Sequence, residues 1–295
     1  MRAVFVSRFG GPEVLELRDV PPPQGELLVE VEAIGVNYRD VYEREGSYGG
    51  EPPFIAGVEG AGRVQRTGEL VAWSSVQGSY AEQVAVPADK AVRVPEGVSA
   101  ELAAAAAMQG MTAHYLATDT YPVQEGDNVL VHAAAGGVGL LLTQIVKLRG
   151  GRVVATTSSE EKAELARTAG ADEVIGYDDV PEHAFEVVYD GVGQATFDRS
   201  LAALRPRGML VLYGAASGPV APVDPMALER GGSLYLTRPS LRHHATAERA
   251  REVYDLIGAG KLDVRIGGRY PLADARKAQE DLEGRRTTGK LLLLP

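Results

Sequence analysis

The stretch Asn128–Leu148 reads NVLVHAAAGGVGLLLTQIVKL and decides how the fold is interpreted. It joins a short apolar run, a cluster of small residues and a second, helix-like apolar run. Dinucleotide sites need this order, because glycines allow a tight turn that brings helix N–H groups to the pyrophosphate. Laid on the G-x-G-x-x-G pattern, the matching positions are Ala134, Gly136 and Gly139. Taken alone, so degenerate a motif is as typical of tight helix packing as of nucleotide binding.

The chain after this stretch alternates between strand-like and helix-like segments. Helices are expected at Val138–Leu148, Glu160–Ala169 and Thr196–Leu204, and strands at RVVATT, EVIGY, FEVVYD, GMLVLYG and SLYLT. Such alternation predicts a parallel, doubly wound sheet and a Rossmann domain of about six strands. Because the glycine cluster stands at the first turn of that series, it is interpreted as a nucleotide-binding turn.

The two ends of the chain follow other patterns. Up to about Ala107 there are many Pro and Gly residues and short apolar runs, such as Leu27–Val31 and Tyr80–Val86, which favour a largely β region. After Pro239 come two expected helices and a last strand, LLLLP. We expect this tail to fold back onto the N-terminal region, with the nucleotide domain inserted between them.

Composition limits the function classes. The net charge of −10 repels nucleic acid as a whole, so a nucleic-acid partner is not expected. No run approaches the ~18 consecutive apolar residues of a membrane helix, and the N-terminus lacks the apolar segment of a signal peptide, so a cytoplasmic protein without membrane contact is expected. With no cysteine in 295 residues, disulfides, thiolate nucleophiles and Cys-ligated zinc are excluded.

The end of the second expected strand indicates which dinucleotide binds. NAD-selective sites place Asp or Glu there, whereas this chain has the hydroxyl residues 156–159 followed by Lys162. Hydroxyls and a cation suit a 2′-phosphate, which favours NADP. In the alternative, Ser158 and Glu161 form a helix capping box and Lys162 is a solvated helix residue. The two interpretations are compatible.

Several stretches resemble the zinc-free quinone oxidoreductase branch of the medium-chain dehydrogenase/reductase superfamily. They are, in order, GGPEVLEL, GVNYRDVY, GVEGAG, AAAGGVG, VVYDGVG, GSLYLTRPSL and TTGKLLLLP. The resemblance implies an α/β protein with a GroES-like, β-rich catalytic domain at 1–110 and 240–295. A Rossmann NADPH-binding domain would occupy 111–239.

Two positions depart from the zinc-dependent relatives of that branch. Asn37 stands where those enzymes carry a Cys ligand, and Val58 where they carry His. The resemblance therefore implies metal-free chemistry. Within the branch, the segment between Gly62 and Gly78 is shorter than usual.

The resemblance also implies which residues carry the reaction. Asn37 and Tyr42 would line the nicotinamide end of the site, and Tyr48 would be the acid or oxyanion donor, for which a phenol of ordinary pKa is suitable. The plainer interpretation makes Tyr42 and Tyr48 amphipathic surface or core residues. Glu59 is interpreted as a structural carboxylate.

Further cofactor contacts are implied by the same resemblance. Only the glycine turn and Lys162 have independent support from physical chemistry, and every other position could be an ordinary loop or cap residue. The implied cofactor-binding residues are Thr112, Gly136, Gly137, Val138, Ser158, Lys162, Tyr177, Ser217, Thr237, Ser240 and Lys290. Of the histidines, His132 is expected to be a packed polar residue, and His243 and His244 a solvated loop and no metal site.

The expected function is that of an NADPH:quinone oxidoreductase that transfers hydride without a metal. Two alternatives remain open: a reductase of α,β-unsaturated carbonyls, either enones or enoyl thioesters, and a non-catalytic, crystallin-like NADPH-binding protein. The partners would be a small quinone or enone and, by analogy, a second copy in a homodimer.

Overall fold

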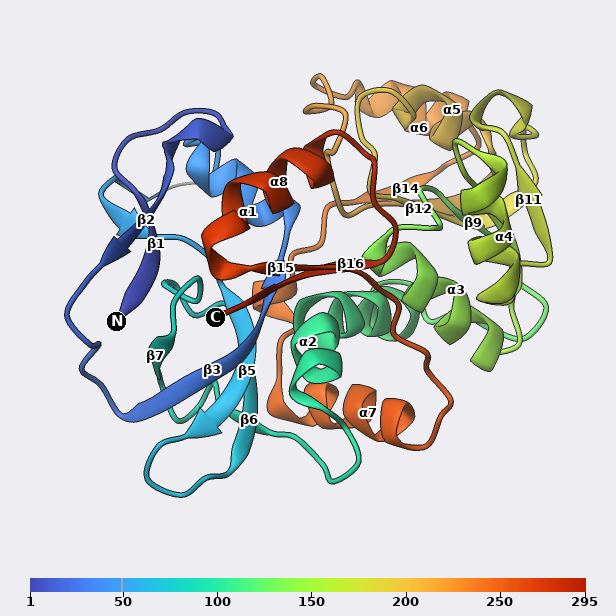
Figure 1. Cartoon of the computed structure of the whole chain (residues 1–295). Helices are drawn as coiled ribbons and strands as arrows, with labels where there is room; N and C mark the ends of the chain where they lie inside the picture. Colours follow the sequence, from blue (N-terminus) through green and yellow to red (C-terminus); the bar gives the residue numbers. More distant parts are fainter. Residues whose placement is uncertain (49) are drawn as a thin grey trace. The chain divides into compact units, whose positions relative to one another are not determined.

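The computed structural model describes residues 1–48 and 50–295, and its contacts divide the chain into two compact units (Figure 1). Unit 1 comprises residues 1–111 and 245–295, and unit 2 comprises residues 112–244. The sequence placed these junctions at 110/111 and 239/240. In the described part of the chain, no helix is both long and apolar enough to cross a membrane.

Unit 2 is built on a six-stranded parallel sheet in the order β11-β10-β9-β12-β13-β14. The chain order reverses between β9 and β12, where doubly wound sheets bind their ligands. The predicted doubly wound parallel sheet is therefore confirmed. The strands are β9 (Asn128–Val131), β10 (Arg152–Thr156), β11 (Glu173–Ile175), β12 (Phe185–Asp190), β13 (Leu204–Leu212) and β14 (Tyr235–Thr237).

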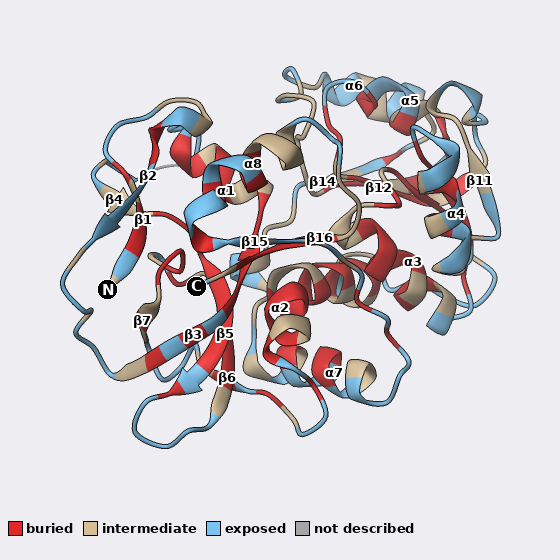
Figure 2. Ribbon diagram, viewed as in Figure 1, coloured by how far each residue is buried: buried red, intermediate tan, exposed pale blue. Residues whose placement is uncertain are grey.

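Helices flank this sheet, and its central strands are buried, as the red strands of Figure 2 show. Val129, Leu130 and Val131 of β9 are all fully buried, so this strand is a continuous apolar run without alternation. The helices are α3 (Gly137–Leu148), α4 (Glu160–Thr168), α5 (Phe197–Ala202) and α6 (Pro225–Arg230), with short turns η2 (Leu116–Thr120), η3 (Tyr177–Asp179) and η4 (Leu241–His243).

Unit 1 is mainly β. Its largest sheet runs β15-β16-β3-β5-β6-β8, with β7 paired to β3, and a second sheet runs β2-β1-β4. The strands are β1 (Arg2–Val6), β2 (Leu15–Asp19), β3 (Leu27–Val36), β4 (Phe54–Ile55), β5 (Glu59–Val64), β6 (Leu70–Ser74), β7 (Gln83–Val86), β8 (Val92–Arg93), β15 (Ile266–Pro271) and β16 (Lys290–Leu294).

The C-terminal strand joins this sheet directly, as the sequence predicted. β16 pairs antiparallel with β3, and Leu291 lies opposite Val36. The helices of unit 1 are α1 (Tyr38–Arg44), α2 (Ala100–Tyr115, whose last residues belong to unit 2), α7 (Ala247–Gly258) and α8 (Ala275–Glu283), with short turns η1 (Pro12–Val14) and η5 (Leu272–Asp274).

Helix α2 corrects the expectation of a β region up to Ala107. Its alanines Ala103–Ala107 are buried, so no polar face marks it as a helix in the sequence. Small side chains let α7 pack closely, and the Tyr254 hydroxyl donates to the Ala103 carbonyl over 3.3 Å. At Gly110 an added Cβ would stand 2.6 Å from Val253 Cγ1. The apolar composition of α2 therefore reflects burial rather than strand structure.

Candidate functional site

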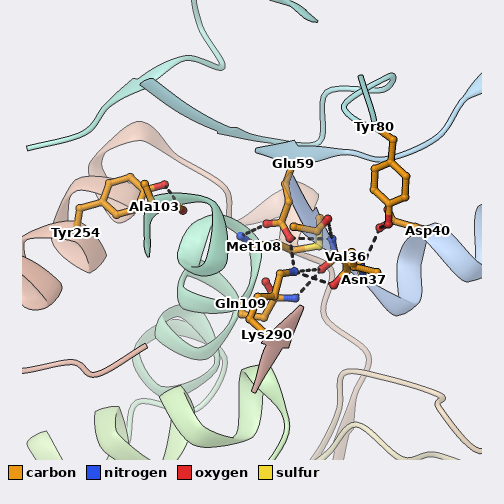
Figure 3. Close-up of polar contacts among 11 residues, drawn as sticks. Val36, Asn37, Asp40, Glu59, Tyr80, Ala103, Met108, Gln109, Tyr254 and Lys290 are labelled. Atoms are coloured by element: carbon orange, nitrogen blue, oxygen red, sulfur yellow. Dashed lines mark hydrogen bonds and ion pairs between the residues drawn. The ribbon is translucent and has the colours of Figure 1, made fainter. Parts of the chain in front are cut away.

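Four buried or partly buried side chains meet in unit 1, and we call them the Asn37 cluster: Asn37, Glu59, Gln109 and Lys290 (Figure 3). Lys290, the first residue of β16, directs its ammonium group to three acceptors. It donates to Val36 O over 2.9 Å, to Asn37 Oδ1 over 2.8 Å, and to Glu59 Oε1. Since Glu59 is fully buried and Lys290 only 3% exposed, this is a buried ion pair.

The remaining contacts of the cluster involve its neutral groups. Asn37 Nδ2 donates to Glu59 Oε1 over 2.8 Å, and Gln109 Nε2 donates to Asn37 Oδ1 over 2.5 Å. The second carboxylate oxygen of Glu59 accepts from the Met108 backbone N–H over 2.7 Å. Space for the carboxylate depends on Gly35, because a Cβ there would stand 2.6 Å from Glu59 Cδ.

Asn37 is also the N-cap of α1, which fixes its backbone. Its N–H donates to Asp40 Oδ2 over 2.9 Å, and the Asp40 N–H donates to the Asn37 backbone carbonyl over 3.1 Å. Tyr80 donates its hydroxyl to the same Asp40 oxygen over 2.8 Å. Burial raises the pKa of Asp40 to about 7, against the opposing effects of Tyr80 and Lys290. Burial lowers the pKa of Lys290, and Glu59 opposes that change.

The two predicted tyrosines have ring contacts with neighbouring side chains. Tyr48 is half exposed, and the guanidinium of Arg39 lies 5.2 Å from its ring centroid. Tyr42 is partly buried on α1, with its ring centroid 6.2 Å from that of Tyr38. A role in catalysis stays a prediction for both residues.

In unit 2, the glycine turn connects β9 to α3. Gly136 is the N-cap of α3, no side chain caps the helix, and its first turn has no acidic residue. The N–H groups of that turn therefore keep their capacity for an anion. Gly139 allows the helix to approach the turn, because a Cβ there would stand 2.5 Å from Ala133 O and 2.7 Å from Ala134 Cα.

Helix α4 begins differently. Its N-cap is Ser159, whose hydroxyl accepts from the Lys162 backbone N–H, and two glutamates occupy its first turn. The alternative capping box of Ser158 and Glu161 is thus wrong by one residue, because the helix starts later. Ser158 instead accepts a 3.3 Å hydrogen bond from Lys162 Nζ. A hydroxyl and an ammonium group therefore lie together just after β10.

The other predicted cofactor residues of unit 2 mostly follow strands of the parallel sheet. Tyr177 opens η3 after β11, Thr237 ends β14, and Ser240 is the N-cap of η4. Ser217, in the loop after β13, donates to Val192 O over 2.8 Å and accepts from Ala195 N–H over 2.9 Å. Thr112, in contrast, lies within α2.

A buried polar network supports these loops, and it was not predicted from the sequence. Asp190 ends β12 and accepts from the backbone N–H groups of Val192 and Gly193, from Thr196 Oγ1 and from Ser200 Oγ. His132 contacts Ser200 Oγ at 3.1 Å and Thr156 Oγ1 at 2.8 Å. Burial lowers the pKa of His132 to about 4. Its neutral ring therefore holds strand ends together, as expected of a packed polar residue.

The expected solvated position is confirmed for His243, which is exposed, and is wrong for His244, which is partly buried. The His244 ring stacks on Tyr115 with centroids 4.3 Å apart, and its Nδ1 lies 3.5 Å from Asp119 Oδ2. Across residues 1–48 and 50–295, no group of three or more His, Asp or Glu side chains is arranged to hold a metal ion.

Two protein-family models match the chain. Residues 23–96 match the alcohol dehydrogenase GroES-like domain, and residues 169–293 match a family described as zinc-binding dehydrogenase. The first match falls within unit 1, and the second begins in unit 2 and ends in β16.

Full-length relatives agree with these matches. The quinone oxidoreductase of Pseudomonas aeruginosa is 42% identical, covering 100% of this chain and 99% of that protein. The 2-haloacrylate reductase of a Burkholderia species is 35% identical, with 99% and 98% covered. A crystal structure of Escherichia coli quinone oxidoreductase complexed with NADPH has a TM-score of 0.95 at 36% identity, with 100% of both chains covered.

The chain is shorter than the first of these relatives. Its alignment with the Pseudomonas protein runs over 323 positions, whereas the chain has 295 residues, so at least 28 positions have no counterpart here. Within the segment that the sequence identified as short, β5 and β6 are joined by a tight turn at residues 65–69.

Proposed function

The chain belongs to the quinone oxidoreductase branch of the medium-chain dehydrogenase/reductase superfamily, and we propose that it reduces quinones with NADPH. The observation that carries the proposal is the uncapped, acid-free N-terminus of α3 directly after β9, in a chain related over its full length to quinone oxidoreductases. Such a helix terminus suits a pyrophosphate, because its N–H groups and its dipole favour negative charge.

The residues present fit NADPH. Gly136, Gly137 and Val138 would face the pyrophosphate, and the Cβ-free position at Gly139 keeps α3 close to the turn. Ser158 and Lys162 would hold the 2′-phosphate, since a hydroxyl and a cation lie together after β10. Tyr177, Ser217, Thr237, Ser240 and Thr112 stay predicted contacts along the rest of the cofactor.

In the proposed reaction, bound NADPH supplies a hydride, and the quinone becomes a hydroquinone after taking up one proton. The task of the protein is to stabilise the negative charge that develops on the quinone oxygen. Asn37 would donate a hydrogen bond to that oxygen, and Tyr48 would supply the proton, either directly or through water. The exposed position of Tyr48 lets it regain a proton from solvent.

The test is a steady-state assay of the purified chain with NADPH and 1,4-benzoquinone, following NADPH absorbance. Turnover with NADPH well above turnover with NADH is expected. Absence of quinone reduction, together with tight NADPH binding, would instead favour the non-catalytic, crystallin-like alternative.

A second candidate is reduction of an α,β-unsaturated carbonyl compound. It is favoured by the 35% identity to a protein named 2-haloacrylate reductase, because the same hydride donor and the same oxygen-stabilising groups serve both reactions. Parallel rates with 1,4-benzoquinone, 2-chloroacrylate and a crotonyl thioester separate the candidates. Fast turnover of an unsaturated acid or thioester with negligible quinone turnover makes the second candidate the better one.

The expected ligand is a small quinone. We also propose that the protein forms a homodimer and that it is located in the cytoplasm. The short strand β14 lies at the edge of its sheet and exposes Tyr235, so a second copy could extend the sheet there. Light scattering of the protein as it elutes from a size-exclusion column measures its mass and so tests the homodimer. Cell fractionation tests its location.

A further inference from the structure

The hydrogen-bond polarity of the Asn37 cluster is fixed at two points. Lys290 can only donate, and an ionised Glu59 can only accept. The Asn37 amide lies between them, with Oδ1 toward the Lys290 ammonium and Nδ2 toward the carboxylate (Figure 3). The reversed amide would set N–H groups against the ammonium and an oxygen against the carboxylate, so it is excluded electrostatically.

Gln109 takes its orientation from this arrangement. Because Asn37 Oδ1 is an acceptor, Gln109 must present Nε2 to it. Both lone-pair positions of Oδ1 are then occupied, by Lys290 and by Gln109. One Nδ2 hydrogen of Asn37 points to Glu59, and the other has only the long 3.3 Å contact with Gly35 O. Because 3.3 Å is long for a hydrogen bond, this second hydrogen is the one for which a ligand oxygen would compete with Gly35 O.

A buried ion pair adds little to stability, because desolvation offsets the attraction between the charges. Glu59 and Lys290 nevertheless occupy the interior of unit 1 where two neutral side chains could pack. We propose that Glu59 and Lys290 are positioning residues, which hold the Asn37 amide so that its second Nδ2 hydrogen is presented to the substrate oxygen. This inference rests on the proposed quinone reduction. No proton leaves Asn37, which only donates a hydrogen bond as the quinone oxygen gains negative charge.

The inference gives Lys290 a different role from the cofactor contact that the family resemblance implied. An ammonium group has three donors, and those of Lys290 are directed to Val36 O, Asn37 Oδ1 and Glu59 Oε1. A positioning role therefore predicts that loss of Lys290 leaves NADPH affinity unchanged. A cofactor contact predicts the opposite.

The experiment compares Lys290→Met, Glu59→Gln, the double variant Lys290→Met/Glu59→Gln, and Lys277→Met as a control. Lys277 belongs to the same unit but pairs with Asp281 near the surface of α8. Each single variant leaves one buried charge unpaired and is expected to unfold at lower temperature. The double variant removes both charges and should recover most of the melting temperature, so it can be assayed even where a single variant fails to fold.

For the double variant we expect kcat to fall about 10- to 100-fold, because small misplacements of a reacting group have effects of this size. The quinone KM and the NADPH dissociation constant should change less than about 2-fold, and the deuterium isotope effect with 4-deuterated NADPH should rise as hydride transfer becomes limiting. Lys277→Met should leave all of these quantities unchanged.

An assay without substrate tests the geometry separately. In the ¹⁵N NMR spectrum, the side-chain amide of Asn37, assigned with Asn37→Asp, should exchange its hydrogens slowly in the wild type and at least about 10-fold faster in the double variant. Equal exchange rates overturn the inference even if the protein reduces no quinone. If kcat recovers in the double variant together with the melting temperature, the inference is also overturned. A loss of NADPH affinity in the double variant overturns it as well. Failure of the wild type to reduce quinones, with slow Asn37 exchange retained, rejects the proposed function and leaves the positioning geometry supported.

Discussion

Replacement of Asp40 by asparagine should change how the stability of the chain depends on pH. Asp40 is buried, and it accepts hydrogen bonds from the Asn37 backbone and from the Tyr80 hydroxyl at one oxygen, Oδ2. Its other oxygen, Oδ1, has no hydrogen-bond partner among the described residues. An asparagine of nearly the same shape can keep both bonds through its own oxygen while having no charge to bury.

The sign and size of the expected change in pH dependence follow from the pKa of Asp40. The pKa of Asp40 is about 7 in the folded chain, against a reference value of 3.8. Between about pH 4 and pH 7, Asp40 is therefore protonated in the folded state and ionised in the unfolded state. The unfolding free energy of the wild type must therefore fall as pH rises through that window, by up to about 1.4 kcal/mol per pH unit. Between about pH 5 and pH 8, the wild type should lose about 2.5 kcal/mol relative to Asp40→Asn.

Urea denaturation of both proteins at matched pH values measures this difference, because the other titrating groups contribute equally to the two curves. Tyr80→Phe is a second check. Its hydroxyl stabilises the ionised carboxylate, so its loss should raise the pKa of Asp40 and move the upper end of the window to higher pH. Parallel stability curves for wild type and Asp40→Asn, or a wild type that gains stability relative to Asp40→Asn as pH rises, would refute the reasoning.

Three further predictions concern the cofactor and the acid. Gly139→Ala should weaken NADPH binding at least about 10-fold, measured by fluorescence titration, because the added Cβ meets the turn backbone. The comparison variant Gly136→Ala should bind NADPH more tightly than Gly139→Ala, because its added Cβ comes no nearer than 3.2 Å to Ala133 O. Lys162→Ala should weaken NADPH at least about 10-fold and leave NADH unchanged; equal loss for both cofactors would contradict a 2′-phosphate contact. Tyr48→Phe should lower quinone kcat by about 10²-fold with unchanged NADPH affinity, and an unaffected kcat assigns the proton to water.

The fold of unit 2 could be predicted because its physical pattern is local. Each strand is a short apolar run, each helix follows with its own periodicity, and the turn between β9 and α3 uses glycine where a side chain would collide with the backbone. The errors in the sequence-based prediction of unit 2 concern the ends of strands and the short helices. The β13 strand begins at Leu204, earlier than its apolar part indicates, and the six-residue helix α6 was not predicted.

Helix α2 could not be recognised for the opposite reason. The helical signal in a sequence is the contrast between a polar and an apolar face, and Ala103–Ala107 are buried all round. A run of small apolar residues without that contrast is compatible with any buried element. Only the packing against α7 distinguishes the possibilities, and packing is not a local property.

The candidate site was only partly predictable, because its residues have no common sequence neighbourhood. Asn37 and Lys290 were found through resemblance to a family, while Gln109 had no signal and Glu59 was expected to be structural. Lys290 reaches Asn37 across 253 positions of sequence. A polar residue at the start of an apolar strand does not reveal which acceptors it meets, so the ion pair with Glu59 could not be inferred.

The sheet register makes that distant contact possible. Lys290 begins β16, and the next residue, Leu291, pairs with Val36, immediately before Asn37. A shift of one residue would turn Lys290 to the opposite face of the sheet and leave Glu59 buried without a cation. Gly289 sets the start of the strand with φ +64°, and a Cβ there would stand 2.4 Å from Arg265 O. The Asn37 cluster is therefore complete only when both ends of the chain have paired in this one register, which ties the geometry of the site to correct folding of unit 1.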